Sequence, residues 1–270
     1  MNRIVKFYHE MGSPPSFYRI TSHWLKPMLF LAIALTLYGL IDGLFFAPTD
    51  YQQGDSYRII FVHVPAAWMS MFIYAIVGIS GIITFVWRMK VAEAVMMASV
   101  PIGALFTVIT LLTGMLWGKP MWGTYWDWDA RMTSELILLF LYIGVAGIYS
   151  AYEEDPRKAA RLAALVAIIG LVNLPVIRYS VYWWTSIHQT ASITLMGGST
   201  GIKDWAMLRP LLVMALATKF YYIYSMLTRA QTYLLKTESK KKWAAKATEV
   251  KTHKTKPNTQ DKGAKDDGNI

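Results

Sequence analysis

The stretch VPAAWMSMFIYAIVGISGIITFVW, residues 64–87, runs for 24 positions without a charged side chain. The hydrocarbon core of a bilayer needs about 20 mainly apolar residues to be crossed by one helix. Residues 94–118 form a second charge-free stretch of sufficient length. Both runs are continuously apolar rather than alternating, which predicts helices and excludes a transmembrane β-barrel.

Four further apolar stretches surround these two. They cover residues 27–41, with an extension past Asp42 to Ala47, and residues 136–152, 162–177 and 205–228. The last is the least clear, because Arg209 and Lys219 interrupt it. Hydrophobic residues make up 54% of the 270 positions and charged residues 16%, a balance typical of membrane proteins. We therefore predict an all-α integral membrane protein with six transmembrane helices.

The distribution of Lys and Arg predicts which side each loop occupies. With the N-terminus inside, the three shorter inner segments, 1–26, 88–93 and 153–161, carry 4, 2 and 3 basic residues. The outer segments, 48–63, 117–134 and 178–204, carry 1, 2 and 2. Basic residues are enriched in cytoplasmic loops, so the pattern predicts that both termini are cytoplasmic.

This layout divides the chain into three parts. Residues 1–26 are a cytoplasmic N-terminal segment, residues 27–228 are the transmembrane domain, and residues 229–270 are a basic tail predicted to be disordered. We expect the tail to lie near the anionic inner leaflet, since it supplies most of the net charge of +10. No small-residue cleavage site follows the first apolar run, so a cleaved signal peptide is not expected. The sequence contains no cysteine, which excludes thiol chemistry.

The predicted outer loop 117–134 contains the sequence WGTYWDWD at residues 122–129. If this loop is helical, its spacing places Trp122, Tyr125, Trp126 and Asp129 on one face. Such a face could lie in the membrane interface as an amphipathic helix or hold a large planar ligand by stacking. For Trp117, Trp68 and Trp205, at other membrane boundaries, an interfacial belt is the better interpretation.

Two of the five histidines favour the ligand-binding interpretation. His63 lies where the first outer loop enters the second helix, and His188 lies in the third outer loop. The layout puts both on the same face as the tryptophan-rich loop. Neutral imidazoles above and below a flat macrocycle suit haem iron. Haem also carries two propionates, and Arg58 and Arg131, both predicted outside, suit carboxylates.

Other sites fit the sequence poorly. The glycine-rich GGSTG at residues 197–201 is not followed by the Lys-Ser/Thr of a phosphate-binding loop, and no Walker motif is present. His63 and His188 also lack the helical HExxH spacing of a zinc hydrolase.

The residues Trp122, Trp126, Trp128 and Asp129 fit the W-G-x-x-W-x-W-D signature of the haem-handling WWD membrane proteins at every fixed position. Over roughly residues 20–230 the chain resembles the haem exporter protein C family of the cytochrome c maturation system. Tyr125 and Asp127 occupy variable positions of the signature, and the long basic tail is atypical.

The resemblance implies a non-enzymatic function. It implies that haem b is held at the outer face of a bacterial inner membrane and passed to a membrane-anchored haem chaperone. The implied partners also include the ABC ATPase and permease subunits and a small membrane subunit of the maturation complex. By position, His63 and His188 match the axial iron ligands, while Trp122, Trp126, Trp128 and Asp129 match the haem-facing motif.

Three other functions are possible for a membrane protein with such a site: a permease, a haem lyase and a b-type cytochrome. A transmembrane permease of an ABC haem exporter should show polar residues along several helix interiors, where this chain is almost uncharged. A haem lyase should be longer, with more helices and histidines. A transmembrane b-type cytochrome should carry its histidines inside the helices, whereas both histidines here are predicted at one face.

Overall fold

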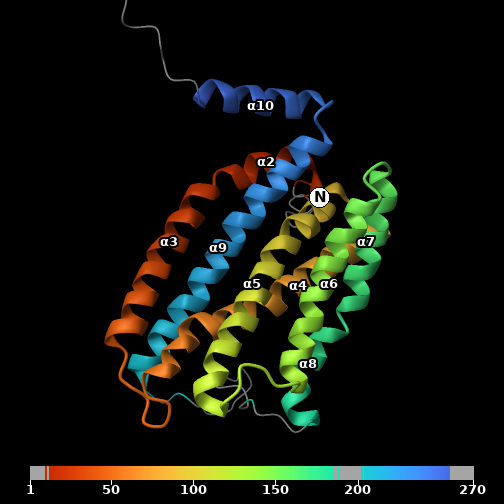
Figure 1. Ribbon diagram of the computed structural model, residues 1–270. Coiled ribbons are helices and arrows are strands. Elements are labelled where there is room, and N and C mark those ends of the chain that lie inside the picture. The colour runs from red at the N-terminus through yellow and green to blue at the C-terminus, as the bar shows by residue number, and fades with distance from the viewer. Residues whose placement is uncertain (1–9, 11, 185–187, 189–201, 203, 256–270) are drawn as a thin grey trace, which may run out of the picture.

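The structure is a computed structural model that describes residues 10, 12–184, 188, 202 and 204–255. Within these residues the chain is helical and contains no strand, which confirms the predicted all-α class. The helices, labelled as in Figure 1, are α2 (Pro14–Ser22), α3 (Leu25–Ile41), α4 (Ile60–Trp87), α5 (Lys90–Trp122), α6 (Ala130–Ala151), α7 (Pro156–Gly170), α8 (Asn173–Trp183), α9 (Trp205–Thr237) and α10 (Lys242–Thr255). A π-helical turn (Asp42–Phe46) continues α3, and a 3-10 turn (Asp55–Ile59) precedes α4.

Six helical segments are long and apolar enough to cross a membrane, as predicted. They are Leu25–Phe46, Asp55–Trp87, Lys90–Trp122, Ala130–Ala151, Pro156–Trp183 and Trp205–Thr237. Most extend beyond the apolar stretches of the sequence, because polar residues at the helix ends continue the backbone hydrogen bonding. The fifth consists of α7 and α8, which are separated by a break at residues 171 and 172.

The centre of the bundle is filled by large side chains. The rings of Tyr74 and Tyr142 are completely buried and meet edge to face with centroids 4.9 Å apart. The Tyr142 hydroxyl donates to the carbonyl of Ser70 at 2.7 Å. Each tyrosine lies against a glycine of a neighbouring helix, since a Cβ at Gly103 or Gly170 would fall within 2.3 Å of its ring or hydroxyl. These close approaches bind α4, α5, α6 and α7 into one packed core.

Asp42, in the first predicted span, and Arg209, in the sixth, form an ion pair. Asp42 lies near the end of the first span and Arg209 near the start of the sixth. Their side chains form an ion pair between the π-helical turn and α9. Helices α3 and α9 run side by side in Figure 1. Because a paired charge costs less at membrane level than an isolated one, the pair explains how both spans tolerate these residues.

The loops sort to the two ends of the bundle. The connections α3–α4 and α5–α6, the C-terminal end of α8 and the N-terminal end of α9 lie at one end, and α2, α10 and the turns after α4 and α6 lie at the other (Figure 1). The helix ends that border the three predicted outer loops therefore share one end of the bundle. Their boundaries differ from the prediction, because α5 continues to Trp122 and α6 begins at Ala130. The non-helical part of the predicted 117–134 loop is therefore only residues 123–129.

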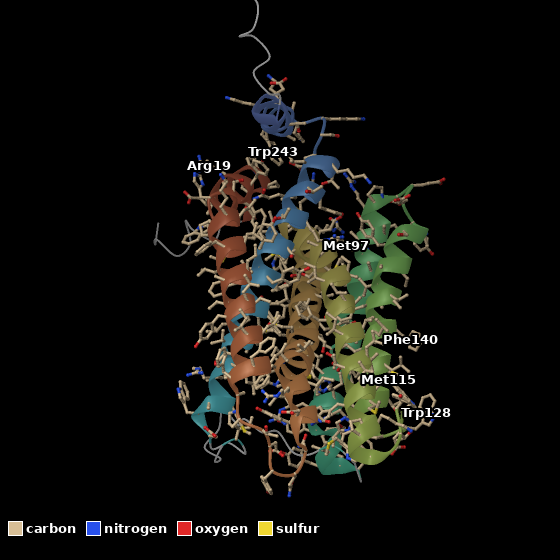
Figure 2. The ribbon with its side chains drawn as sticks, turned by 60° about the vertical axis from the view of Figure 1, so that its left-hand side comes forward. Arg19, Met97, Met115, Trp128, Phe140 and Trp243 are labelled. Atoms are coloured by element: carbon tan, nitrogen blue, oxygen red, sulfur yellow. The ribbon has the colours of Figure 1, made fainter. Side chains whose placement is uncertain are left out.

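The start of the basic tail is helical over the residues that the structure describes. Helix α9 continues to Thr237, and α10 follows after a short turn. The ring nitrogen of Trp243 donates to Glu238 at 2.8 Å, and its ring lies 6.0 Å from that of Tyr18 on α2. Figure 2 shows Trp243 at the opposite end of the bundle from Trp128. Trp243 therefore attaches the start of the tail to α2, a contact that the charge pattern of the tail does not predict. Residues 256–270 lie outside the described residues.

Candidate haem-binding site

His63 lies in the first turn of α4, and α5 holds its imidazole from the side. Nδ1 of His63 lies 2.9 Å from the hydroxyl of Thr113, and the Trp117 ring meets the imidazole edge to face at 5.7 Å. Gly114 leaves the space for the ring, because a Cβ there would lie 3.2 Å from Cε1 of His63. The imidazole therefore has a fixed place between two helices.

Trp117 has a more specific position than the interfacial belt that the sequence suggested. Its ring nitrogen donates to Oε1 of Gln53 in the first outer loop at 3.1 Å, while its ring packs on His63. Trp205, by contrast, is 61% exposed at the start of α9 and keeps the character of a belt residue. Trp117 thus links the first outer loop to the candidate ligand, and its distance from Gln53 along the chain concealed this contact.

His188 approaches the tryptophan-rich loop from the third outer loop. Its Nδ1 lies 3.0 Å from Oδ1 of Asp129, and its ring lies 5.5 Å from that of Trp122. Burial lowers the pKa of His188 below its ordinary value, although the neighbouring Asp129 carboxylate acts in the opposite direction. His188 is therefore neutral at pH 7, the form in which an imidazole can bind iron.

Asp129 is buried and performs two tasks with one side chain. Its Oδ1 accepts from the backbone amides of Arg131 at 3.0 Å and Met132 at 3.1 Å, which caps the N-terminus of α6. The same oxygen lies against Nδ1 of His188. Asp129 therefore contributes a cap to the helix that follows the tryptophan-rich loop. Asp129 thus orients a histidine as well as a helix.

The tryptophans of the loop do not form the single helical face that was considered from their spacing. Helix α5 ends at Trp122, where Gly123 takes a φ of +78°, and residues 123–129 are not helical. Trp126 and Trp128 instead meet edge to face at 5.4 Å. Trp128 is 74% exposed and projects from the outer end of the bundle (Figure 2). The structure therefore brings Trp122 to His188 and leaves Trp128 on the surface.

The two predicted arginines have different surroundings. Arg58 is engaged locally, with Nε 2.9 Å from Asp55 and Nη1 donating to the carbonyl of Gly43 at 2.9 Å. Arg131 lies in the first turn of α6, close enough to His63 and His188 for its charge to act on both imidazoles. Arg131 is thus associated with both histidines, whereas Arg58 supports the first outer loop.

A third arginine was missed by the sequence analysis. Arg178 lies on α8, which packs against α6, and its charge interacts with that of Arg131. Its Nη1 atom is buried and has no hydrogen-bond partner among the residues that the structure describes. The apolar stretch ends at residue 177, so hydropathy alone places Arg178 at the start of the third predicted outer loop. Two neighbouring guanidiniums with an unsatisfied buried donor would suit an anion.

The donor set fits a macrocycle better than a bare metal ion. Within the described part of the chain, no group of three or more His, Cys, Asp or Glu side chains could hold a metal. Two imidazoles alone leave most positions of an iron ion unfilled, and the four nitrogens of a porphyrin would fill them. Aromatic rings lie beside both histidines, Trp117 beside His63 and Trp122 beside His188. With the arginines at the same end, they complete a site suited to a flat, dianionic ligand.

Six membrane spans, a tryptophan-rich loop and a histidine on either side of it at one end of the bundle define a multi-pass membrane protein of the haem-handling class. Residues 7–245 match the model of the family described as Heme exporter protein C. Heme exporter protein C of Escherichia coli K12 is 44% identical over 244 residues, covering 89% of this chain and 96% of the relative. The Bradyrhizobium diazoefficiens protein of the same name is 45% identical over 214 residues, covering 79% and 80%.

A relative from the liverwort Marchantia polymorpha is 45% identical over 169 residues, covering 63% of this chain and 71% of its own. It is described as a putative cytochrome c biosynthesis ccmC-like mitochondrial protein. The chain belongs to the heme exporter protein C family, which confirms the resemblance seen in the sequence. Membership places it among membrane transport components linked to cytochrome c biogenesis and not among enzymes.

Proposed function

We propose that the protein binds haem b at the outer face of a bacterial inner membrane and delivers it to a membrane-anchored haem chaperone during c-type cytochrome biogenesis. The observation that carries this proposal is the convergence of His63 and His188 on either side of the tryptophan-rich loop. Each Nδ1 lies at hydrogen-bond distance from an oxygen, at 2.9 Å and 3.0 Å. The two Nε2 atoms can then serve as axial donors to one iron.

The remaining residues of the site would contact the macrocycle and the propionates of haem. Trp122 and Trp126 offer apolar ring surface for the macrocycle. Arg131 and Arg178 supply cations for the propionates, while Arg58 stabilises the loop that leads to His63. Trp128, exposed at the end of the bundle, is suited to contact the chaperone.

Release of the cargo requires partners, and we infer that these are the subunits of a cytochrome c maturation complex. The ABC ATPase supplies the energy that this chain, which has no Walker motif, cannot supply. The permease subunit and a small membrane subunit complete the membrane part of the complex. The relative from Marchantia polymorpha, described by its role in cytochrome c biosynthesis, supports this assignment.

The alternative is that this chain is the conducting permease of an ABC haem exporter. The packed interior favours delivery over conduction, because Tyr74, Tyr142 and Leu138 at the centre of the bundle are fully buried. ATP-dependent haem flux in vesicles that contain this chain and the ATPase would favour conduction. Haem transfer to the chaperone without such flux would favour delivery.

The decisive experiment is the absorption spectrum of the purified, haem-loaded protein. We expect a six-coordinate, low-spin spectrum. His63→Ala and His188→Ala should each convert it to a five-coordinate or mixed spectrum, and added imidazole should restore the low-spin form. His23→Ala, at the other end of the bundle, is the matched control and should leave the spectrum unchanged. If both site variants keep the low-spin spectrum without imidazole, the axial assignment is wrong.

A further inference from the structure

The hydrogen bonds of Thr113 determine which nitrogen of His63 carries a proton. The single hydroxyl proton of Thr113 is directed to the carbonyl of Ile109 at 2.6 Å, with the carbonyl of Thr110 at 3.2 Å. The hydroxyl can therefore only accept from His63, whose Nδ1 lies 2.9 Å away. The Thr110 carbonyl, a pure acceptor, also interacts with His63. His63 thus carries its proton on Nδ1 and a lone pair on Nε2.

His188 reaches the same tautomer with a different partner. Oδ1 of Asp129 accepts from two backbone amides, which favours the ionised carboxylate. An ionised carboxylate only accepts, so its 3.0 Å contact with Nδ1 of His188 favours the tautomer that carries the proton on Nδ1 and the lone pair on Nε2. The two histidines therefore present the same atom to the ligand. They differ in the acceptor behind them, which is a neutral hydroxyl for His63 and an anion for His188.

We propose that Thr113 is a positioning residue for His63, and that the difference between its hydroxyl and the Asp129 carboxylate makes His63 the weaker and more readily exchanged axial ligand. The inference rests on the proposed function, because it concerns the same two histidines. A carboxylate that accepts from the far nitrogen increases the basicity of a metal-binding imidazole, and a hydroxyl that is already donating elsewhere does so less. An incoming ligand would then replace His63 on the haem iron first, while His188 stays bound and retains the haem.

The order of ligand strength can be measured directly. In the ferrous haem complex of His63→Ala the remaining ligand is His188, and in that of His188→Ala it is His63. Resonance Raman spectra should show the iron–histidine stretch at higher frequency in His63→Ala than in His188→Ala. Equal frequencies, or the reverse order, would overturn the inference and leave the proposed function intact. Six-coordinate low-spin spectra for both variants would instead overturn the proposed function.

The role of Thr113 is tested in the protein that keeps both histidines. Thr113→Val should lower the imidazole concentration that displaces half of the His63 ligation by about three- to tenfold, the range expected for one hydrogen bond. Thr113→Ser, which keeps the hydroxyl, should restore the wild-type value. Thr107→Val is the matched control, since this buried threonine donates to Gly103 on the same helix, two turns from the site. If Thr107→Val and Thr113→Val change the imidazole midpoint equally, the effect is general packing and the inference fails.

Discussion

Arg209 and Asp42 form a bidentate ion pair. Nε of Arg209 donates to Oδ2 of Asp42 at 2.8 Å, and Nη2 donates to Oδ1 at 2.5 Å. The pair joins residues that lie 167 positions apart in the sequence. It connects the outer end of the first span to the start of the sixth span, next to two of the three outer loops. Planar guanidinium and carboxylate groups match in this geometry, which makes it more specific than a contact between point charges.

We expect the Asp42–Arg209 pair to be required for the packing of α3 on α9. Asp42→Ala and Arg209→Ala should each lower the thermal midpoint in detergent, because each leaves one charge without its partner at membrane level. The double variant Asp42→Ala/Arg209→Ala should be more stable than at least one single variant. Midpoints measured by the loss of the monomer peak in size-exclusion chromatography would test this. Strictly additive losses would show that the two side chains are not coupled.

Trp126 should contribute to retention of the cargo without determining the spin state of its iron. Stacking on a protein aromatic ring contributes about 1–3 kcal/mol, so Trp126→Ala should speed haem loss about tenfold or more. The low-spin spectrum should persist, because both histidines remain, whereas transfer to the chaperone should be poor. Transfer of haem to apomyoglobin and to the purified chaperone would measure both effects.

The matched control for Trp126 is Trp205→Ala. Trp205 is 61% exposed at the same end of the bundle, outside the signature. Trp117 is not a suitable control, although it also lies outside the signature, because its ring packs on His63. If Trp126→Ala retains and transfers haem normally while Trp205→Ala does not, the tryptophans of the signature are only interfacial belt residues.

Arg178→Ala and Arg58→Ala should differ in their effects. A charge-assisted hydrogen bond contributes about 1.5–3 kcal/mol, so loss of the Arg178 guanidinium should weaken haem binding roughly tenfold or more. Arg58→Ala should act mainly on stability, because its described partners are Asp55 and the Gly43 carbonyl. Binding of haem and of its dimethyl ester should be compared in both variants. If a propionate binds Arg178, the difference in affinity between haem and its dimethyl ester should be smaller in Arg178→Ala than in the wild type or in Arg58→Ala.

Acidification should detach α10 from the bundle. Burial opposes ionisation of Glu238, but hydrogen bonds from Lys90 and Trp243 hold the pKa of Glu238 below its ordinary value of 4.5. A carboxyl whose pKa is lowered by folding stabilises the folded state above that ordinary pKa. The contribution is lost as the pH falls through the lowered pKa.

Hydrogen exchange of α10 would test this role of Glu238. At neutral pH we expect faster exchange in Glu238→Gln than in the wild type, and a smaller further increase on acidification below pH 4.5. Glu249→Gln, on α10 itself, serves as a control for loss of a single carboxylate from the tail. Equal pH profiles for wild type and Glu238→Gln would show that Glu238 does not hold α10.

The predicted topology can be tested with reporter fusions. Fusions after Thr124 and after Gly198 should both report a periplasmic location, because the positive-inside pattern places both loops outside. A fusion after Glu154, between α6 and α7, should report the cytoplasm. Cytoplasmic results at both sites would place the candidate site on the inner face. A cytoplasmic result at only one site would separate His188 from the tryptophan-rich loop and exclude a shared site.

The number of spans was predictable from the sequence because each span is a long apolar run, and lipid leaves such a run no alternative to a helix. The sequence also predicted that His63, His188 and the tryptophan-rich loop share one end of the bundle, since alternating spans fix which loops lie together. Asp42 and Arg209 were visible only as interruptions. Whether the two charges pair depends on which helices are neighbours, and hydropathy does not contain that information.

The second layer of the site was not predictable. Thr113 and Trp117 lie one helical turn apart, so a shared face could have been noticed within the span 94–118. Nothing in the sequence indicated that this face meets His63. Arg178 was assigned to a loop because hydropathy measures the apolar run and not the helix, and α8 continues to Trp183. Helix packing sets these contacts, which is why they required coordinates.

The length of α4 sets the depth at which cargo is held. His63 lies 24 residues from Trp87 at the other end of the helix, a rise of about 36 Å. The hydrocarbon layer is about 30 Å thick, so with Trp87 at its inner boundary we expect the imidazole at the level of the lipid headgroups rather than among the acyl chains. A porphyrin with two carboxylates is itself amphiphilic, with an apolar plane and a charged edge. At this depth we expect such a molecule to keep its charged edge in water and its apolar plane against lipid.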